Sequence, residues 1–147
     1  LFDSTKIPNE IIDSVVVSKE SLEKEGGEAF ACAVIDAFYQ VNAAIADPAK
    51  RNDTLIAIGE KFANVTLEDM EKVVQQTKFY STPDEGIALL TGSELPDIMG
   101  RVVDFCSSHG ILESKPTLGY GDAAESPDAA VRFDPSFIQK VKAGLAK

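Results

Sequence analysis

Residues 11–17, Ile11-Ile12-Asp13-Ser14-Val15-Val16-Val17, decide the fold class of this chain. Five of the seven are β-branched and apolar, and Pro8 precedes them. This nearly continuous pattern predicts a strand covered on both faces, as in a parallel sheet. A parallel strand needs neighbours, and no other segment shows a comparable pattern. We therefore expect its partner strands to lie upstream of this chain.

The rest of the sequence is dominated by helix signals. Ser18 precedes a first helix, and residues 28–47 are apolar around most of a helical circumference, which predicts a mostly buried helix. Thr82 with Glu85 three residues later predicts a capping box. Further helix starts are expected at Asp47-Pro48, Thr66, Ser93-Glu94-Leu95-Pro96 and Asp134-Pro135, and helix ends at Gly92 and at His109-Gly110. Residues 112–126 lack periodicity and predict a surface loop, whereas residues 131–133 predict a short extended piece.

Composition limits the possible functions. The chain has 147 residues, of which 44% are hydrophobic and 26% charged, as in one globular domain. Fourteen Lys and Arg against 24 Asp and Glu give a net charge of −10, so we expect no nucleic-acid partner. With one His and two Cys, neither a histidine metal cluster nor a Cys-x-x-Cys site can be written. We expect no metal, no cofactor and no catalytic residue.

The sequence also carries signals about the location of the chain. The longest apolar run, residues 29–46, is interrupted by Asp36, Gln40 and Asn42, so we expect no membrane-spanning helix and a soluble chain. The first residue is Leu1 rather than Met, and no signal-peptide pattern is visible. We therefore expect a processed or truncated piece of a longer protein.

Several weaker motifs each have a structural explanation. Gly119-Tyr120-Gly121 begins like a phosphate-binding loop but lacks the third glycine and a preceding predicted strand. His109 falls in the last turn of a predicted helix, where a polar cap is favoured over a general base. Cys32 and Cys106 lie among apolar neighbours on separate helices, and they suit either small buried thiols or a disulfide.

The opening segment differs, because it gathers hydroxyls and carboxylates just ahead of the predicted strand. Asp13 interrupts the apolar run itself, and an acid there is costly unless it is paired or faces a cleft. Ligand contact and structural pairing are both open for Asp13. Glu10 and Ser4 are further candidate ligand-binding residues, because they stand in the same polar segment.

The order of these segments resembles a known family, the periplasmic solute-binding proteins of the nitrate, sulfonate and taurine type, which serve ATP-driven importers. Residues 3–13, Asp-Ser-Thr-Lys-Ile-Pro-Asn-Glu-Ile-Ile-Asp, are similar to the family's Asp-Ser-Ser-Lys-Ile-Pro-Gly-Glu-Ile-Ile-Asp segment, with Asn9 in place of glycine. Residues 79–85, Phe-Tyr-Ser-Thr-Pro-Asp-Glu, are similar to its Phe-Tyr-x-Thr-Pro-x-Glu helix start, and residues 93–110 and 131–134 follow in order. The branch it most resembles is the one often encoded beside urea carboxylase genes.

The resemblance implies the C-terminal half of a two-lobed α/β fold of the type II periplasmic-binding-protein kind, predominantly helical in this segment. Residues 1–14 would end the second lobe and cross the hinge, and residues 15–147 would form the C-terminal part of the first lobe. Such proteins close two lobes on a ligand by a hinge motion.

The implied function is a non-catalytic, periplasmic binding protein that captures a small polar solute containing nitrogen or sulfur and delivers it to a membrane permease. Urea, guanidine and taurine represent the solute class. Asp13, and more weakly Glu10 and Ser4, would hold its hydrogen-donating nitrogen end, because a carboxylate only accepts hydrogen bonds. The further partner would be the missing N-terminal half or another copy.

Two alternatives stay open. Thiamine-pyrimidine synthases resemble the same scaffold, but they depend on histidine- and cysteine-containing motifs near the cleft, where this sequence offers His109 and two cysteines in apolar surroundings. The second alternative is a helical interaction module without a ligand.

Overall fold

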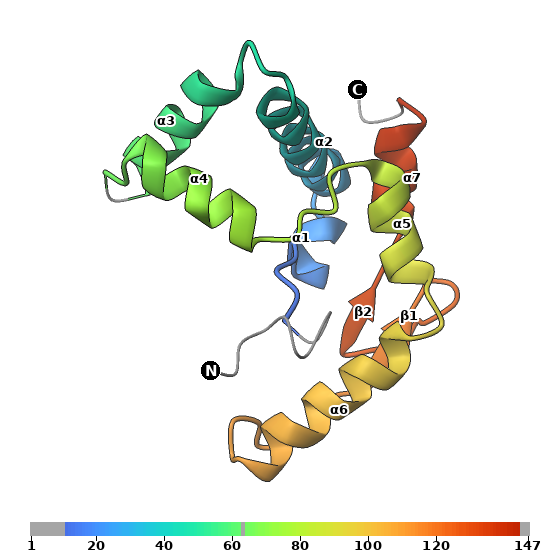
Figure 1. Cartoon of the computed structure of the whole chain (residues 1–147). Helices are drawn as coiled ribbons and strands as arrows, with labels where there is room; N and C mark the ends of the chain where they lie inside the picture. Colours follow the sequence, from blue (N-terminus) through green and yellow to red (C-terminus); the bar gives the residue numbers. More distant parts are fainter. Residues whose placement is uncertain (1–10, 63, 145–147) are drawn as a thin grey trace.

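Seven helices and one two-stranded parallel sheet form the described part of the computed structural model, which comprises residues 11–62 and 64–144 (Figure 1). The chain is therefore mixed α/β but mostly α. In order, the elements are α1 (Lys19–Glu23), α2 (Gly27–Ala46), α3 (Arg51–Lys61), α4 (Leu67–Gln76), α5 (Pro83–Thr91), α6 (Leu95–Ser108), β1 (Leu118–Tyr120), β2 (Val131–Phe133) and α7 (Ser136–Lys142).

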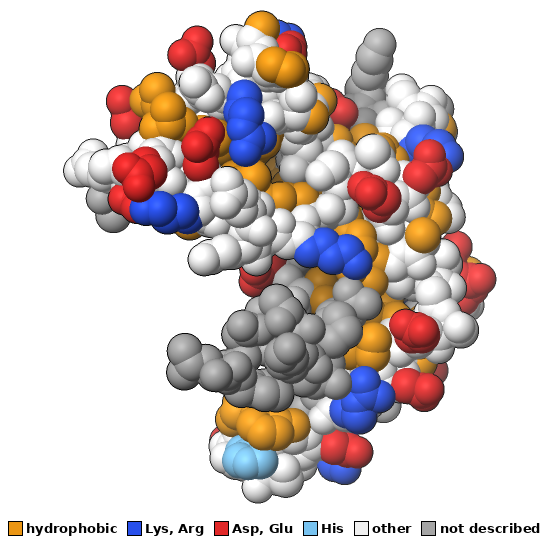
Figure 2. Space-filling view, in the orientation of Figure 1, with side chains coloured by type: hydrophobic (Ala, Val, Ile, Leu, Met, Phe, Trp, Pro, Cys, Tyr) orange, Lys and Arg blue, Asp and Glu red, His pale blue; other side chains and the backbone are white. Residues whose placement is uncertain are grey.

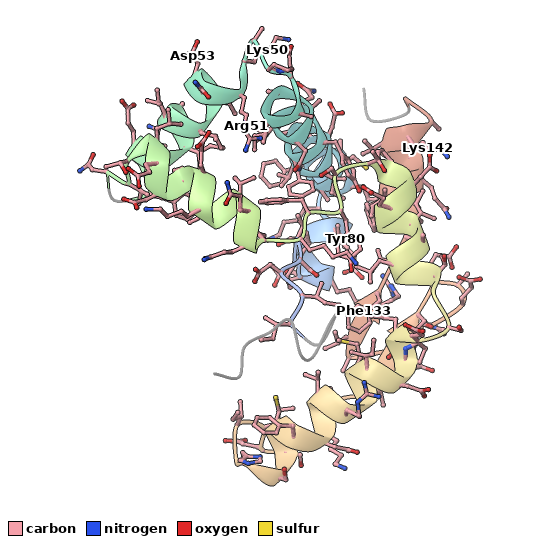
Figure 3. All side chains as sticks on the ribbon, in the orientation of Figure 1. Lys50, Arg51, Asp53, Tyr80, Phe133 and Lys142 are labelled. Atoms are coloured by element: carbon pink, nitrogen blue, oxygen red, sulfur yellow. The ribbon has the colours of Figure 1, made fainter. Side chains whose placement is uncertain are left out.

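Helix α2 is the centre of the packing. It contacts α1, α3 and α7, while α4 packs on α3, and α5 packs on α7 and α6 (Figure 1). Arg51 fixes the corner between α2 and α3, because its Nη1 donates to the carbonyl oxygen of Ile45 at 3.1 Å (Figure 3). The fully buried Leu55 lies on α3. The other buried hydrophobic residues in the described chain are Ala31, Cys32, Met70, Leu95 and Ile98.

The C-terminal helix α7 joins segments that are far apart in the sequence. Lys140 on α7 pairs with Glu28 on α2 at 2.7 Å, and Lys142 pairs with Asp84 on α5 (Figure 3). The backbone of α5 approaches both neighbouring helices closely at Gly86. A Cβ atom there would lie 2.5 Å from the Tyr39 hydroxyl oxygen of α2 and 3.1 Å from Cδ1 of Ile138 of α7. Helices α2, α5 and α7 therefore meet at Gly86, where a larger side chain would crowd its neighbours.

Three of the seven described helices begin at a capping side chain that the sequence signals. Ser18 caps α1, and Thr66 caps α4 by accepting from the Asp69 amide. Thr82 and Glu85 form the expected capping box of α5, which ends at Gly92. These side chains satisfy amide groups that have no partner within the helix. Gly110, with φ of 69°, follows α6 in the left-handed conformation, as expected of a terminating glycine.

The expected strand over residues 11–17 is wrong. These residues form no strand, and Ile11, Val15 and Val16 are 70%, 49% and 89% exposed. The described chain offers no strand beside this segment, since its one sheet pairs β1 with β2 only. A β-branched segment without a neighbour cannot satisfy its backbone groups in a ladder, so it remains irregular.

The expectation that residues 28–47 form a mostly buried helix is also wrong. Helix α2 forms over nearly the expected range, but Phe30 is 69% exposed and Val34, Phe38 and Val41 are 38–41% exposed. The helix continues through the polar interruptions: Asp36 accepts from the Gln40 side chain, and the Asn42 side chain donates to the Phe38 carbonyl. By length and composition alone α2 could cross a membrane, which is weak evidence because soluble core helices pass the same test.

Two smaller expectations also need correction. Asp47-Pro48 forms a turn rather than the first turn of α3, because the Asp47 carboxylate accepts from the Ala49 amide and α3 begins at Arg51. Within the expected loop at residues 112–126, Leu118–Tyr120 forms β1. The three residues pair in parallel with β2, in the register Leu118 with Val131 and Tyr120 with Phe133. The expected extended piece at residues 131–133 is confirmed as β2.

Candidate functional site

The site residues expected from the sequence lie at or beyond the start of the described chain. Asp13 is exposed, in the irregular segment that precedes α1. Glu10 and Ser4 lie outside the described residues. The structure therefore does not place the three residues relative to one another, and their role in ligand binding stays a prediction.

A second group of polar side chains lies where the parallel strands end. Parallel sheets commonly bind ligands beyond the carboxyl ends of their strands. Tyr120 ends β1 and Phe133 ends β2, and their rings stack with centroids 5.4 Å apart and planes 12° apart (Figure 3). Arg132 and Asp134 flank Phe133 in the sequence, and their ion pair has an Nε to Oδ2 distance of 3.5 Å. We call Tyr120, Arg132, Phe133 and Asp134 the strand-end cluster.

Two buried donors of this cluster have no hydrogen-bond partner among the described residues: the Tyr120 hydroxyl and Nε of Arg132. Buried polar groups are normally satisfied, so two such atoms on adjacent strands are unusual. Burial raises the pKa of Tyr120, and the negative charge of Asp97 on α6 raises it further. The hydroxyl thus keeps its proton at neutral pH and can donate it in a hydrogen bond.

The Asp134 carboxylate serves the fold. Its Oδ1 accepts from the Ser136 amide at 2.8 Å, which supports the start of α7, and its Oδ2 lies near Arg132. Neighbouring residues alternate between the faces of a strand, so Arg132 projects opposite to Tyr120 and Phe133. The Tyr120 hydroxyl and the Arg132 guanidinium therefore do not converge on one point.

The loop after β1 explains the glycines at 119 and 121. A Cβ on Gly119 would lie 2.5 Å from the Cβ of Ala129 and 2.6 Å from that of Ser126, and Gly121 has φ of 94°. The Ser126 hydroxyl donates to the carbonyl of Tyr120 and accepts from its amide. Both glycines thus serve close packing and a turn, which favours the structural explanation of this motif over a phosphate-binding loop.

The same loop borders a shallow, open hollow of about 260 Å³. It is lined by Thr117, Leu118, Gly119, Ser126, Pro127, Asp128 and Ala129. The Thr117 hydroxyl is already engaged, donating to the carbonyl of Asp128 and accepting from the amide of Ala130. The hollow therefore offers few free polar groups.

His109 and the cysteines occupy structural positions. The His109 ring stacks on Phe105 with centroids 4.0 Å apart, and its Nδ1 lies 2.9 Å from the Phe105 carbonyl oxygen at the end of α6. Cys32 is a free, buried thiol whose pKa is raised, chiefly by burial. Cys106 is free and partly exposed, so the disulfide alternative is wrong for this structure. Within residues 11–62 and 64–144, no group of three His, Cys, Asp or Glu side chains is placed to hold a metal ion.

In Figure 2, hydrophobic side chains are visible between α4 and α5, with charged side chains beside them. Lys78 and Tyr80 belong to the segment joining these helices, and the Lys78 ammonium lies 4.9 Å from the Tyr80 ring centroid. The Lys78–Tyr80 pair and the strand-end cluster are thus held by contacts within the chain. They do not supply a nucleophile and base in contact with each other.

Sequence reasoning did not find the strand-end cluster. Three-residue strands are too short to show a period, so nothing marked Tyr120 and Arg132 as lying on neighbouring strands. Comparison of the chain with known protein families, with curated proteins and with solved structures finds no significant match.

Proposed function

We propose that this chain is part of the solute-binding component of an ATP-driven importer. The component captures a small polar solute containing nitrogen or sulfur, of the urea, guanidine or taurine kind, and delivers it to a membrane permease from the periplasm. The order of motifs along the chain supports the proposal, because it resembles that of the nitrate, sulfonate and taurine binding proteins. The fold at the coarse level, mostly helical with a small parallel sheet, is compatible with it.

The observation that carries the proposal is the state of residues 11–17. Their side chains are of strand type, but Ile11, Val15 and Val16 lie exposed, and no strand of the described chain lies beside the segment. A crossover strand of a two-lobed protein requires parallel neighbours, and the described residues supply none for this segment. Asp13 within this segment would then face the hinge and accept hydrogen bonds from the nitrogen end of the solute.

The enzyme alternative receives less support from the described residues. His109 lies against the Phe105 carbonyl at a helix end, and Cys32 is buried with a raised pKa, so it is protonated at neutral pH. Cys32 therefore lacks the thiolate form that nucleophilic catalysis needs, and Nδ1 of His109 serves the helix end.

Uptake by living cells tests the proposal. Cells that carry or lack the encoding gene are supplied with radiolabelled urea, guanidine or taurine, and the initial rate of uptake is measured. We expect loss of the gene to abolish high-affinity uptake of at least one solute, and the protein to be released with the periplasmic fraction by osmotic shock. Unchanged uptake of all three solutes, or retention in the cytoplasm, would contradict it.

A further inference from the structure

The exposed face of α2 has the spacing of a helix–helix contact. Phe30, Val34, Ala37, Val41 and Ala44 follow one another at intervals of four, three, four and three residues. This alternation keeps side chains on one line along a helix that packs on another helix. We call these five residues the α2 seam. Four of the five are exposed and Ala44 is partly exposed, so no element of the described chain covers the line.

We propose that the α2 seam is the contact between two copies of this chain, packed as an antiparallel helix pair about a two-fold axis. Two-fold contacts require a surface that fits itself. The seam meets this condition, because Ala37 lies at its midpoint and the large Phe30 at one end comes opposite the small Ala44 at the other. Large and small side chains then interlock without a change in either helix.

Charge favours a second copy over a charged partner. The chain carries a net charge of −10, yet none of the five seam residues, which lie between residue 29 and residue 46, is ionisable. Asp36, the one ionisable side chain in that span other than tyrosine and cysteine, is partly buried and accepts from Gln40 at 2.7 Å. An uncharged partner surface is therefore required, and the seam is itself such a surface. Repulsion between two acidic copies remains at longer range and is screened by salt.

The exposed area indicates a weak rather than a permanent dimer. Phe30 is 69% exposed and Phe38, beside the seam, is 41% exposed; with about 200 Å² for each Phe side chain, the two present roughly 220 Å². Val34 and Val41, at 38% and 41% exposed, add less. The area buried by the seams of two copies, with the alanines included, approaches roughly 1,000 Å², the lower limit for specific interfaces. We expect association in the micromolar range.

The opposite side of α2 argues against insertion into a bilayer. That side contacts α3 and α7, and Glu28 is paired with Lys140 of α7 at 2.7 Å. A membrane-spanning α2 would have to leave these contacts and carry Asp36 into the hydrocarbon. A helix partner leaves them intact.

Sedimentation equilibrium of the whole chain tests the proposal. Masses are measured from about 1 to about 300 µM protein, a range that covers micromolar dissociation constants. We expect the mass to rise from 15.8 kDa toward twice that value, and the association to strengthen several-fold as salt is raised from about 0.05 M to about 0.5 M. The matched variants are Ala37→Glu on the seam and Ala43→Glu, which is exposed on another side of the same helix. The first should stay monomeric with an unchanged circular dichroism spectrum, and the second should associate like the parent.

Cross-linking gives an independent readout. In a Cys106→Ser background, Ala37→Cys should form disulfide-linked dimers on mild oxidation, and Ala43→Cys should not. A parent that is monomeric at every concentration, equal disruption by both glutamate variants, or association that weakens with salt would overturn the proposal. A monomer that floats with phosphatidylcholine vesicles would also overturn it, in favour of a lipid partner.

Discussion

Gly86→Ala and Gly100→Ala are expected to change stability in opposite directions. Both glycines lie within helices, in α5 and α6, and in each case the substitution improves helix propensity by about 0.5–1 kcal/mol. They differ in the space beside them. A Cβ at Gly86 would lie 2.5 Å from the Tyr39 hydroxyl oxygen and 3.1 Å from Cδ1 of Ile138, whereas nothing lies within 4 Å of a Cβ at Gly100.

The magnitudes follow from these contacts. An extra carbon in a filled site costs about 1–3 kcal/mol against a gain in helix propensity of about 0.5–1 kcal/mol, so Gly86→Ala should lower the free energy of unfolding by up to about 2.5 kcal/mol. Gly100→Ala should raise it by about 0.5–1 kcal/mol. For a chain of this size each kcal/mol shifts the thermal midpoint by about 2–4 °C. The two variants should therefore melt on opposite sides of the parent.

Urea unfolding followed by circular dichroism at neutral pH measures both differences on one scale. If Gly86→Ala is stabilised as much as Gly100→Ala, the close meeting of α2, α5 and α7 at Gly86 does not exist in solution. The central packing described above would then be wrong.

Three further predictions concern a cap, a titrating acid and the thiols. Thr82→Ala removes one half of the α5 capping box and should lower the free energy of unfolding by about 1 kcal/mol in the same urea assay. The Thr66 hydroxyl donates to the Asp69 carboxylate and lowers its pKa. The stabilising effect of the charge is therefore complete above the unfolded-state pKa and is lost as pH falls through the folded-state value. Asp69→Asn should thus have a lower thermal midpoint than the parent at pH 7, and the difference between the two midpoints should disappear in strong acid. In thiol titration of the native protein, Cys106 should react first, and Cys32, whose pKa is raised by burial, should react only on unfolding. Equal reaction rates of the two thiols would contradict the burial of Cys32.

Local chemistry explains which helix boundaries could be predicted. The caps at Thr66 and Thr82 depend on atoms within three residues of each other, so a short window contains the whole cause. The turn at Asp47 shows the limit of that reasoning. Its carboxylate does accept a nearby amide, but from Ala49 in a turn, and α3 starts later, at Arg51.

Non-local structure could not be predicted in the same way. The pattern of residues 11–17 identifies a segment suited to a sheet, but whether a sheet forms depends on strands elsewhere. The apolar circumference of α2 likewise predicts a helix whose surface is favourably buried. The pattern does not show whether the residues that bury it belong to this chain. The strand-end cluster depends on a three-residue pairing of β1 with β2, and only the tertiary structure brings Tyr120 beside Phe133.

The role of Asp13 tests the proposed function most directly. Titration calorimetry compares the parent with Asp13→Asn, which keeps the size and removes the charge, using urea, guanidinium, taurine and nitrate. The protein is purified from its own host, so that every segment present in the cell is present in the experiment. Asp53→Asn, the same change in the first turn of α3, is the control.

We expect the parent to bind a solute with an N–H donor group, and Asp13→Asn to lose about 1.5–3 kcal/mol of binding free energy, a tenfold or greater loss of affinity. Asp53→Asn should bind like the parent. Equal affinity of the parent and Asp13→Asn for every nitrogen-containing solute, or a preference of the parent for nitrate, would contradict the account.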